Sequence, residues 1–131
     1  MANILELLEQ VPPFEQGRFT RMRERLRSNM EEGIGKENLD TNRFEQEILY
    51  YLEKMDITEE KVRLEQHCKY FIEQVDNQQQ SAGRTLNFIS QEMGREINTL
   101  GAKAYDSDIQ RLVVQMKDEL EKIKEQLANV L

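Results

Sequence analysis

Two stretches of this sequence carry polar residues whose types and spacing suit chemistry. Residues 59–67 read EEKVRLEQH, and residues 83–99 read GRTLNFISQEMGREINT. In the first stretch, Glu60, Arg63 and His67 follow at spacings of three and four, which places them on one face of a helix. Because imidazole changes charge near neutral pH, a histidine beside a carboxylate can bind a metal or move a proton. The alternative is a structural histidine at the edge of an apolar stripe.

The second stretch carries an unusual polar face for a helix. Opposite its apolar residues lie two arginines and two amides, Arg84, Gln91, Arg95 and Asn98. Phe88 points the same way, and an aromatic ring among arginines and amides suits base stacking and phosphate contact. The alternative is that Phe88 packs on a neighbouring helix.

One flank of this helix carries two carboxylates. Glu92 and Glu96 are four residues apart and therefore project together. Two carboxylates suit a hard divalent cation such as Mg²⁺ or Mn²⁺, which prefers oxygen ligands. Ordinary pairs between glutamate and arginine are equally available at this spacing.

Apolar periodicity predicts that the elements carrying these residues are all helices. Short breaks at the adjacent prolines Pro12-Pro13 and near residues 33–40, 56, 76–81 and 101–107 divide the chain into about five to six of them. The clearest apolar stripes are Leu64, Cys68, Phe71 and Val75; Leu86, Ile89, Met93, Ile97 and Leu100; and a seam from Ile109 to Val130 in a long C-terminal helix. Phe44, Ile48, Tyr51, Leu52 and Met55 predict the buried face of an earlier helix.

The helix predicted after residue 14 is rich in arginine. Arg18, Arg21 and Arg25 share a face of it, beside an apolar stripe that includes Phe19. A solvated face paired with glutamates of the same segment explains this pattern, and a phosphate-facing stripe is the alternative.

Composition excludes several classes of protein. The net charge is −7, which argues against a nonspecific nucleic-acid coat protein but not against a local basic patch. A single cysteine cannot form a disulfide within the chain and fits a reducing compartment. There is no membrane-length apolar run and no signal-peptide pattern. We therefore expect a cytoplasmic, all-α protein that is not inserted in a membrane.

The two polar stretches resemble the C-terminal domain of the YicC family of bacterial proteins. DITEEKVRLEQH at 56–67 matches the family pattern D-I-x-E-E-x-x-R-L-x-x-H, and AGRTLNFISQEMGREINTLGAKA at 82–104 matches G-R-x-L-D-F-x-x-Q-E-x-x-R-E-x-N-T-x-x-S-K. The sequence departs from the pattern at Asn87, where an aspartate is expected, and at Gly101-Ala102, where Ala/Gly-Ser is usual. The amide at Asn87 removes one possible charged metal ligand.

The resemblance implies a cytoplasmic endoribonuclease that acts on RNA, with divalent-metal dependence and assembly into a ring-like homo-oligomer. It also implies that residues 45–131 form the C-terminal helical domain, and that residues 1–44 are the helical link from an N-terminal domain. The catalytic candidates are Glu60, His67 and Glu92, and the candidate metal ligands are Glu60, His67, Glu92 and Glu96. The candidates for contact with RNA are Arg63, Arg84, Gln91, Arg95 and Asn98.

The residues leave the mechanism and the class of function open. His67 could act without a metal, as a base on the RNA 2′-hydroxyl. The domain could instead be a noncatalytic helical module that binds RNA or assembles an oligomer. A third interpretation makes the seam at 109–130 the main feature, as in a coiled-coil adaptor.

Overall fold

The computed structural model describes residues 2–35, 40–77 and 82–130, and nearly all of them are helical. The helices are α1 (Ala2–Glu9), α2 (Val11–Glu15), α3 (Arg18–Ile34), α4 (Thr41–Met55), α5 (Thr58–Asn77), α6 (Ala82–Lys103) and α7 (Ser107–Val130). The predicted all-α class and the long amphipathic C-terminal helix are therefore confirmed. Within the described residues there are seven helical segments, because the chain around the prolines forms the separate short helix α2.

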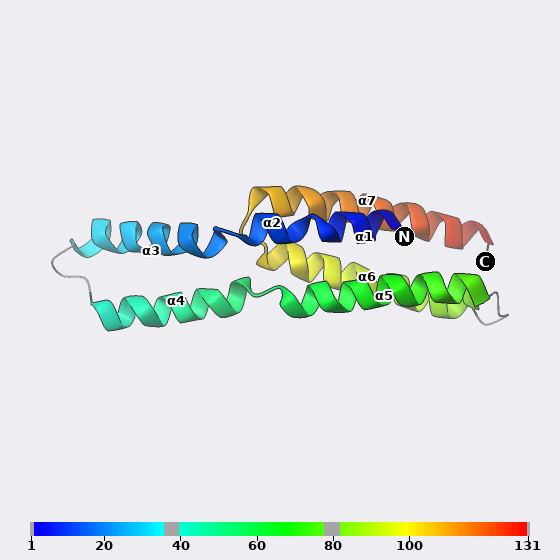
Figure 1. The fold of residues 1–131 in the computed structure, drawn as a ribbon, viewed down its shortest axis with the longest axis horizontal. Coiled ribbons are helices and arrows are strands. Elements are labelled where there is room, and N and C mark those ends of the chain that lie inside the picture. The colour runs from blue at the N-terminus through cyan, green and yellow to red at the C-terminus, as the bar shows by residue number, and fades with distance from the viewer. Residues whose placement is uncertain (1, 36–39, 78–81, 131) are drawn as a thin grey trace.

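The molecule is an elongated rod with two parts (Figure 1). Helices α3 and α4 lie side by side and project from one end as a hairpin, which we call the arm. Helices α1, α5, α6 and α7 lie together and form the bundle. Helix α5 continues roughly along the line of α4, so the arm and the bundle share one long axis.

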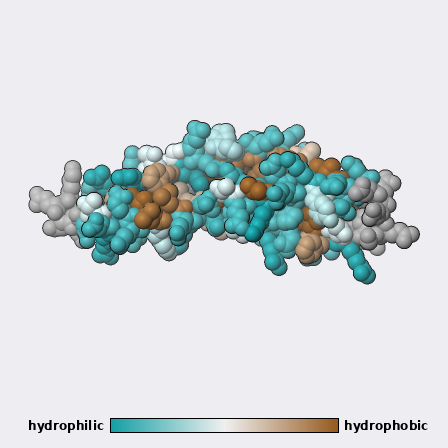
Figure 2. All heavy atoms as spheres, turned by 60° about the horizontal axis from the view of Figure 1, so that its bottom comes forward, coloured by the Kyte–Doolittle hydropathy of each residue, from teal (hydrophilic) through white to brown (hydrophobic). Residues whose placement is uncertain are grey.

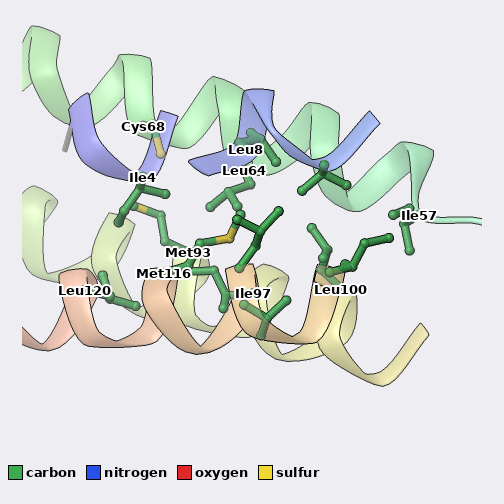
Figure 3. Packing of buried hydrophobic residues seen from close by; sticks show 14 of the residues in the cluster. Ile4, Leu8, Ile57, Leu64, Cys68, Met93, Ile97, Leu100, Met116 and Leu120 are labelled. Carbon is green, nitrogen blue, oxygen red and sulfur yellow. The ribbon is translucent and has the colours of Figure 1, made fainter. Parts of the chain in front are cut away.

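The hydrophobic core lies inside the bundle, where side chains from α1, α5, α6 and α7 interdigitate (Figure 3). Leu64 and Cys68 of α5 face Met93 and Ile97 of α6, and α7 contributes Met116. The predicted stripes of α6 and of the first turns of α7 are confirmed, because each of their residues up to Leu120 is buried. The seam thins beyond that point, where Ile123 and Leu127 are only partly buried.

The arm is less well packed than the sequence predicts. Leu52 was expected in the buried face of α4, yet 39% of its surface is exposed. Phe19 on α3 and Val75 near the end of α5 are likewise exposed. These expectations were wrong for the arm because two helices side by side can bury only the narrow stripe that faces the partner. Val75 lies two residues before the end of α5 at Asn77. Figure 2 shows the result as apolar patches on a mainly hydrophilic surface, one of them on the arm.

Helix ends follow local signals in the sequence. Asp40 accepts hydrogen bonds from the backbone N–H groups of Asn42 and Arg43 at the start of α4, as an N-cap residue does. Asp56 accepts one from the N–H of Thr58 at the start of α5. Asp106, which the sequence left inside a break, accepts one from the N–H of Ile109 and caps α7. Ser81, whose residue type would suit a cap before α6, lies outside the described residues.

Across the described ranges, no helix is both long enough and apolar enough to span a membrane.

Candidate functional site

The centre of the candidate site is a hydrogen-bonded pair that joins α5 to α6. The Nδ1 atom of His67 lies 2.7 Å from Oε1 of Glu96. The Glu96 side chain is only 8% exposed, whereas that of His67 is 30% exposed. The carboxylate is therefore held inside the helix interface, and the imidazole bridges from it to solvent. This is a geometry in which the carboxylate fixes the orientation of the ring.

A second polar pair joins the same two helices at some distance from the first. Lys103 Nζ donates to Oε1 of Glu60 over 2.9 Å. Seven residues separate Glu60 from His67 on α5, and seven separate Glu96 from Lys103 on α6. At about 1.5 Å per residue, the two pairs are about 10 Å apart along the helices. The structure thus brings His67 and Glu96 together and places Glu60 in a separate contact.

Burial and charge act against each other on Glu96. Burial raises the pKa of its carboxyl above the ordinary value, while the hydrogen bond from His67 and the charge of that ring lower it. The neighbouring charge of Glu92 raises it further and that of Arg63 lowers it, and the net direction is upward. Both Glu92 and Arg63 are therefore close enough to Glu96 to influence its carboxyl electrostatically.

The predicted RNA-contacting residues lie on the exposed surface of α5 and α6. Arg63 is one turn before His67 and pairs with Glu59 of its own helix. Arg95 approaches Glu92 to 3.9 Å and is otherwise exposed. Three more candidates are exposed on α6, namely Arg84, Gln91 and Asn98. Phe88 is 63% exposed on the same helix, so among the described residues it is not covered by a neighbouring helix.

The predicted metal ligands do not surround one position. In the described part of the chain, no group of three or more His, Cys, Asp or Glu side chains could hold a metal ion. Glu60 has one buried oxygen, Oε2, without a hydrogen-bond partner there, but its neighbour is the ammonium of Lys103. Of the predicted set, His67 and Glu96 are in contact and Glu92 lies four residues before Glu96, whereas Glu60 is in the separate contact with Lys103.

Cys68, next to His67, belongs to the core and not to the site. Its side chain is fully buried, and burial raises the pKa of its thiol to about 12. A thiol that stays protonated at neutral pH is a poor nucleophile. The expectation that Cys68 is a small core residue is confirmed.

The sequence missed two cations that the structure places at element junctions. Lys103 is the partner of Glu60. Arg18 was expected on a solvated or phosphate-facing side of α3 and is instead buried, because its guanidinium donates to the carbonyls of Met55, Lys103 and Ala104 at the ends of α4 and α6. Lys103 belongs to the quoted resemblance, which ends in lysine, so a signal was present. Nothing in the local sequence of Arg18 distinguishes it from the other arginines of α3.

Comparison with known proteins supports the family resemblance of the two polar stretches on α5 and α6. The sequence model of a family described as "Endoribonuclease YicC-like, C-terminal" matches residues 11–131. This chain belongs to that family. It is 39% identical over 127 residues to a "Probable endoribonuclease YicC" of Clostridioides difficile (strain 630), a match that covers 94% of this chain and 42% of the relative.

A second relative in the family gives the same result. The chain is 36% identical over 108 residues to a "Probable endoribonuclease YicC" of Haemophilus influenzae (strain ATCC 51907 / DSM 11121 / KW20 / Rd). That match covers 82% of this chain and 37% of the relative. The chain thus spans about two fifths of the length of these relatives. The family match begins at residue 11, upstream of the boundary at 45 that the resemblance implied.

Proposed function

We propose that this chain is the C-terminal domain of an endoribonuclease that hydrolyses RNA phosphodiester bonds, with His67 and Glu96 at the reacting centre. The observation that carries the proposal is the 2.7 Å contact between a partly exposed imidazole and a buried carboxylate. Membership of the family and the names of both relatives support the class of reaction. RNA as substrate, a cytoplasmic location and assembly into a homo-oligomer belong to the same proposal.

The pair supplies what general base catalysis on RNA requires. When ionised Glu96 accepts the Nδ1–H of His67, the lone pair of Nε2 remains free to take a proton. Nε2 takes the proton of a 2′-hydroxyl, the 2′-oxygen attacks the adjacent phosphorus, and the bond from phosphorus to the 5′-oxygen breaks. The departing 5′-oxygen takes a proton from water, and the hydroxide left behind takes the proton held on Nε2. The products are a 2′,3′-cyclic phosphate and a 5′-hydroxyl. A second water then opens the cyclic phosphate.

The surrounding arginines would hold the substrate. Arg63 lies one turn from His67 and Arg95 next to Glu96, and both guanidiniums are mostly exposed. Guanidinium groups bind phosphate oxygens in pairs and stabilise negative charge that develops on them. Exposed amides at Gln91 and Asn98 extend the same polar surface along α6.

Divalent-metal assistance, which the resemblance implies, stays a separate proposal. Because the four predicted ligands do not surround one position, the mechanism above uses no metal ion. Mg²⁺ sites on phosphate substrates often use one or two carboxylates together with water and phosphate oxygens. Glu92 and Glu96 are the residues that would supply such a site.

The rival proposal is a noncatalytic helical module. It is favoured by the pair Glu60–Lys103, which resembles the pair His67–Glu96 in joining α5 to α6 and has no evident chemistry. On that view both pairs only align helices, and the exposed polar surface binds RNA or a second copy without cleaving anything.

Cleavage of labelled RNA by the complete protein separates these proposals. General base catalysis contributes about 10²- to 10⁴-fold, so His67→Ala should cut at least about a hundred times more slowly than wild type. Glu96→Gln should also cut slowly, because a neutral amide does not stabilise the positive charge that the His67 ring acquires when it takes the proton. Lys69→Ala is the matched control, because Lys69 forms an exposed pair with Glu65 on the same helix.

The ends of the products and a chelator distinguish the mechanisms. Base catalysis by His67 forms a 2′,3′-cyclic phosphate, which early time points detect before it is hydrolysed, and continues in EDTA. Direct attack by a metal-activated water leaves no cyclic phosphate and stops in EDTA. If His67→Ala and Glu96→Gln fold and cut at the rate of wild type, the assignment of the reacting centre is wrong.

A further inference from the structure

A groove between α3 and α4 lies outside the site described above. It has a volume of about 500 Å³ and is open to solvent, at the place where the arm joins the bundle. Its polar lining consists of three arginines, one amide and two tyrosines, Arg18, Arg21, Arg25, Asn29, Tyr51 and Tyr105. Met22, Leu26 and Met55 complete the wall, so the groove combines an apolar floor with cationic and aromatic groups.

The charge of the groove is opposite to that of the whole chain. Three arginines and no carboxylate line it, whereas the chain carries a net charge of −7. Arg25 forms no ion pair within the described residues, and Arg21 pairs over 2.7 Å with Asp106 while remaining mostly exposed. Helix α3 carries its Glu24, Glu31 and Glu32 outside this lining. An anion that enters the groove therefore meets the guanidinium groups of Arg21 and Arg25, of which only Arg21 already has a carboxylate partner, Asp106, among the described residues.

Tyr105 gives the groove an aromatic wall at a cost in backbone energy. Its φ angle is +49°, the left-handed region that glycine and asparagine adopt more readily than a bulky residue. The ring is half exposed and meets Tyr51 edge to face, with ring centroids 6.5 Å apart. A bulky residue in a strained conformation at the wall of a groove points to a role for its side chain.

We propose that this groove binds single-stranded RNA, with phosphates on Arg21 and Arg25 and a base stacked on Tyr105. The proposal rests on the proposed function, since it supplies a grip for the same substrate away from the reacting centre. Aromatic stacking beside a cationic groove is a general way to bind single strands. Glu96 lies eight residues before Ala104, whose carbonyl Arg18 contacts, so about 12 Å along α6 separate groove and centre.

The test is binding of the complete protein to a labelled single-stranded RNA that cannot react. An oligonucleotide with methylated 2′-hydroxyls, in EDTA, excludes both mechanisms of cleavage, and fluorescence anisotropy reports binding. Tyr105→Asn keeps a residue that tolerates positive φ and removes the ring, so the fold is retained. Arg25→Gln removes one exposed guanidinium. Arg27→Gln is the matched control, because Arg27 lies on α3 outside the groove and pairs with Glu31.

The two variants should weaken binding in different ways. Tyr105→Asn should weaken it at least about five-fold, with an unchanged dependence on salt. Arg25→Gln should weaken it and also lower the slope of log K against log salt by about 0.7. Arg27→Gln should bind like wild type, and double-stranded RNA should compete poorly, because its bases cannot stack on the ring.

The outcomes separate this proposal from the proposed function. Wild-type affinity in both groove variants overturns the groove, even if His67→Ala abolishes cleavage. Weakened binding together with unimpaired cleavage by His67→Ala keeps the groove and overturns the reacting centre. If Arg25→Gln and Tyr105→Asn change the sedimentation of the protein and leave RNA affinity intact, the groove is a contact between copies, and the RNA proposal is wrong.

Discussion

Glu96 combines burial with a titratable partner, and this makes stability depend on pH. Its pKa is raised in the folded state, so folding favours the protonated carboxyl. The stability that Glu96 contributes is fully present below the ordinary glutamate value of 4.5 and is lost as pH rises through the raised folded value. Glu96→Gln resembles the protonated form and does not titrate. The free energy of unfolding of wild type, relative to this variant, should therefore fall as pH rises through that window.

Urea unfolding at a series of pH values measures the difference. Glu65→Gln serves as the exposed control, and it should change stability by less than about 0.5 kcal/mol. If the free energy of unfolding of wild type instead rises relative to Glu96→Gln as pH rises, the hydrogen bond from His67 outweighs burial, and the raised pKa of Glu96 is wrong.

At the residue scale, the sequence predicted which side of a helix each polar residue lies on, but not which residue of the next helix it contacts. Spacing placed Glu60 and His67 on one side of α5, because helical geometry is local. Which residue of α6 each one meets depends on the register between two helices, and the sequence of one helix does not contain it. The predicted four-ligand set therefore mixed residues of two separate contacts.

At the scale of elements, two glycines of α6 face α7 at different separations. A Cβ added at Gly94 would lie 3.5 Å from Leu120 Cδ2, an ordinary contact, whereas one at Gly101 would lie 3.0 Å from Val113 Cγ1. Gly94→Ala should raise the free energy of unfolding by about 0.5–1 kcal/mol, because alanine favours helix. Gly101→Ala should leave the free energy of unfolding unchanged or lower it, because the added methyl group comes too close to Val113.

Urea denaturation of both variants tests the difference in packing. Val113→Ala should make Gly101→Ala less costly in the double variant, since it removes the colliding methyl group. Equal stabilisation by Gly94→Ala and Gly101→Ala would show that α7 shifts freely at Gly101.

Helix type was predictable from periodicity, and helix ends from capping residues, as at Asp40. The close approach at Gly101 was not, because a glycine inside a helix has the same local signature whether or not another helix touches it. The sequence also predicted a break from Gly101, because glycine commonly ends a helix. This start was wrong, since α6 continues to Lys103.

At the scale of the whole molecule, Arg18 links the arm to the bundle. Its guanidinium donates to the carbonyl of Ala104 over 2.7 Å, to that of Lys103 over 3.3 Å and to that of Met55 over 3.0 Å. These carbonyls lie at the C-terminal ends of α6 and α4, where helices leave carbonyl groups unpaired. One buried side chain of α3 therefore holds the ends of two other helices.

Arg18→Met should lower the free energy of unfolding by about 2–4 kcal/mol, because two buried hydrogen bonds to carbonyls and one partly buried one lose their charged donor. Hydrogen exchange should rise first in α3 and α4, whose apolar contacts are few. Arg27→Met, an exposed change on the same helix, should leave both quantities nearly unchanged. Uniform loss of protection in arm and bundle would contradict a linking role for Arg18.

The arm itself was beyond prediction from sequence. Amphipathic stripes on α3 and α4 indicated two core-facing helices, and nothing local distinguishes a stripe that meets a core from one that meets a single partner helix. The exposure of Leu52 and Phe19 follows from that arrangement in space.

The equal spacing of the two polar pairs between α5 and α6 determines how these helices align. Apolar stripes that recur every three or four residues fit nearly as well after a slide of seven residues. A slide of that length in one direction would place Glu60 opposite Glu96, two like charges at a buried interface. A slide in the other direction would place His67 opposite Lys103. The apolar core thus permits several alignments of the two helices, and the polar pairs select one.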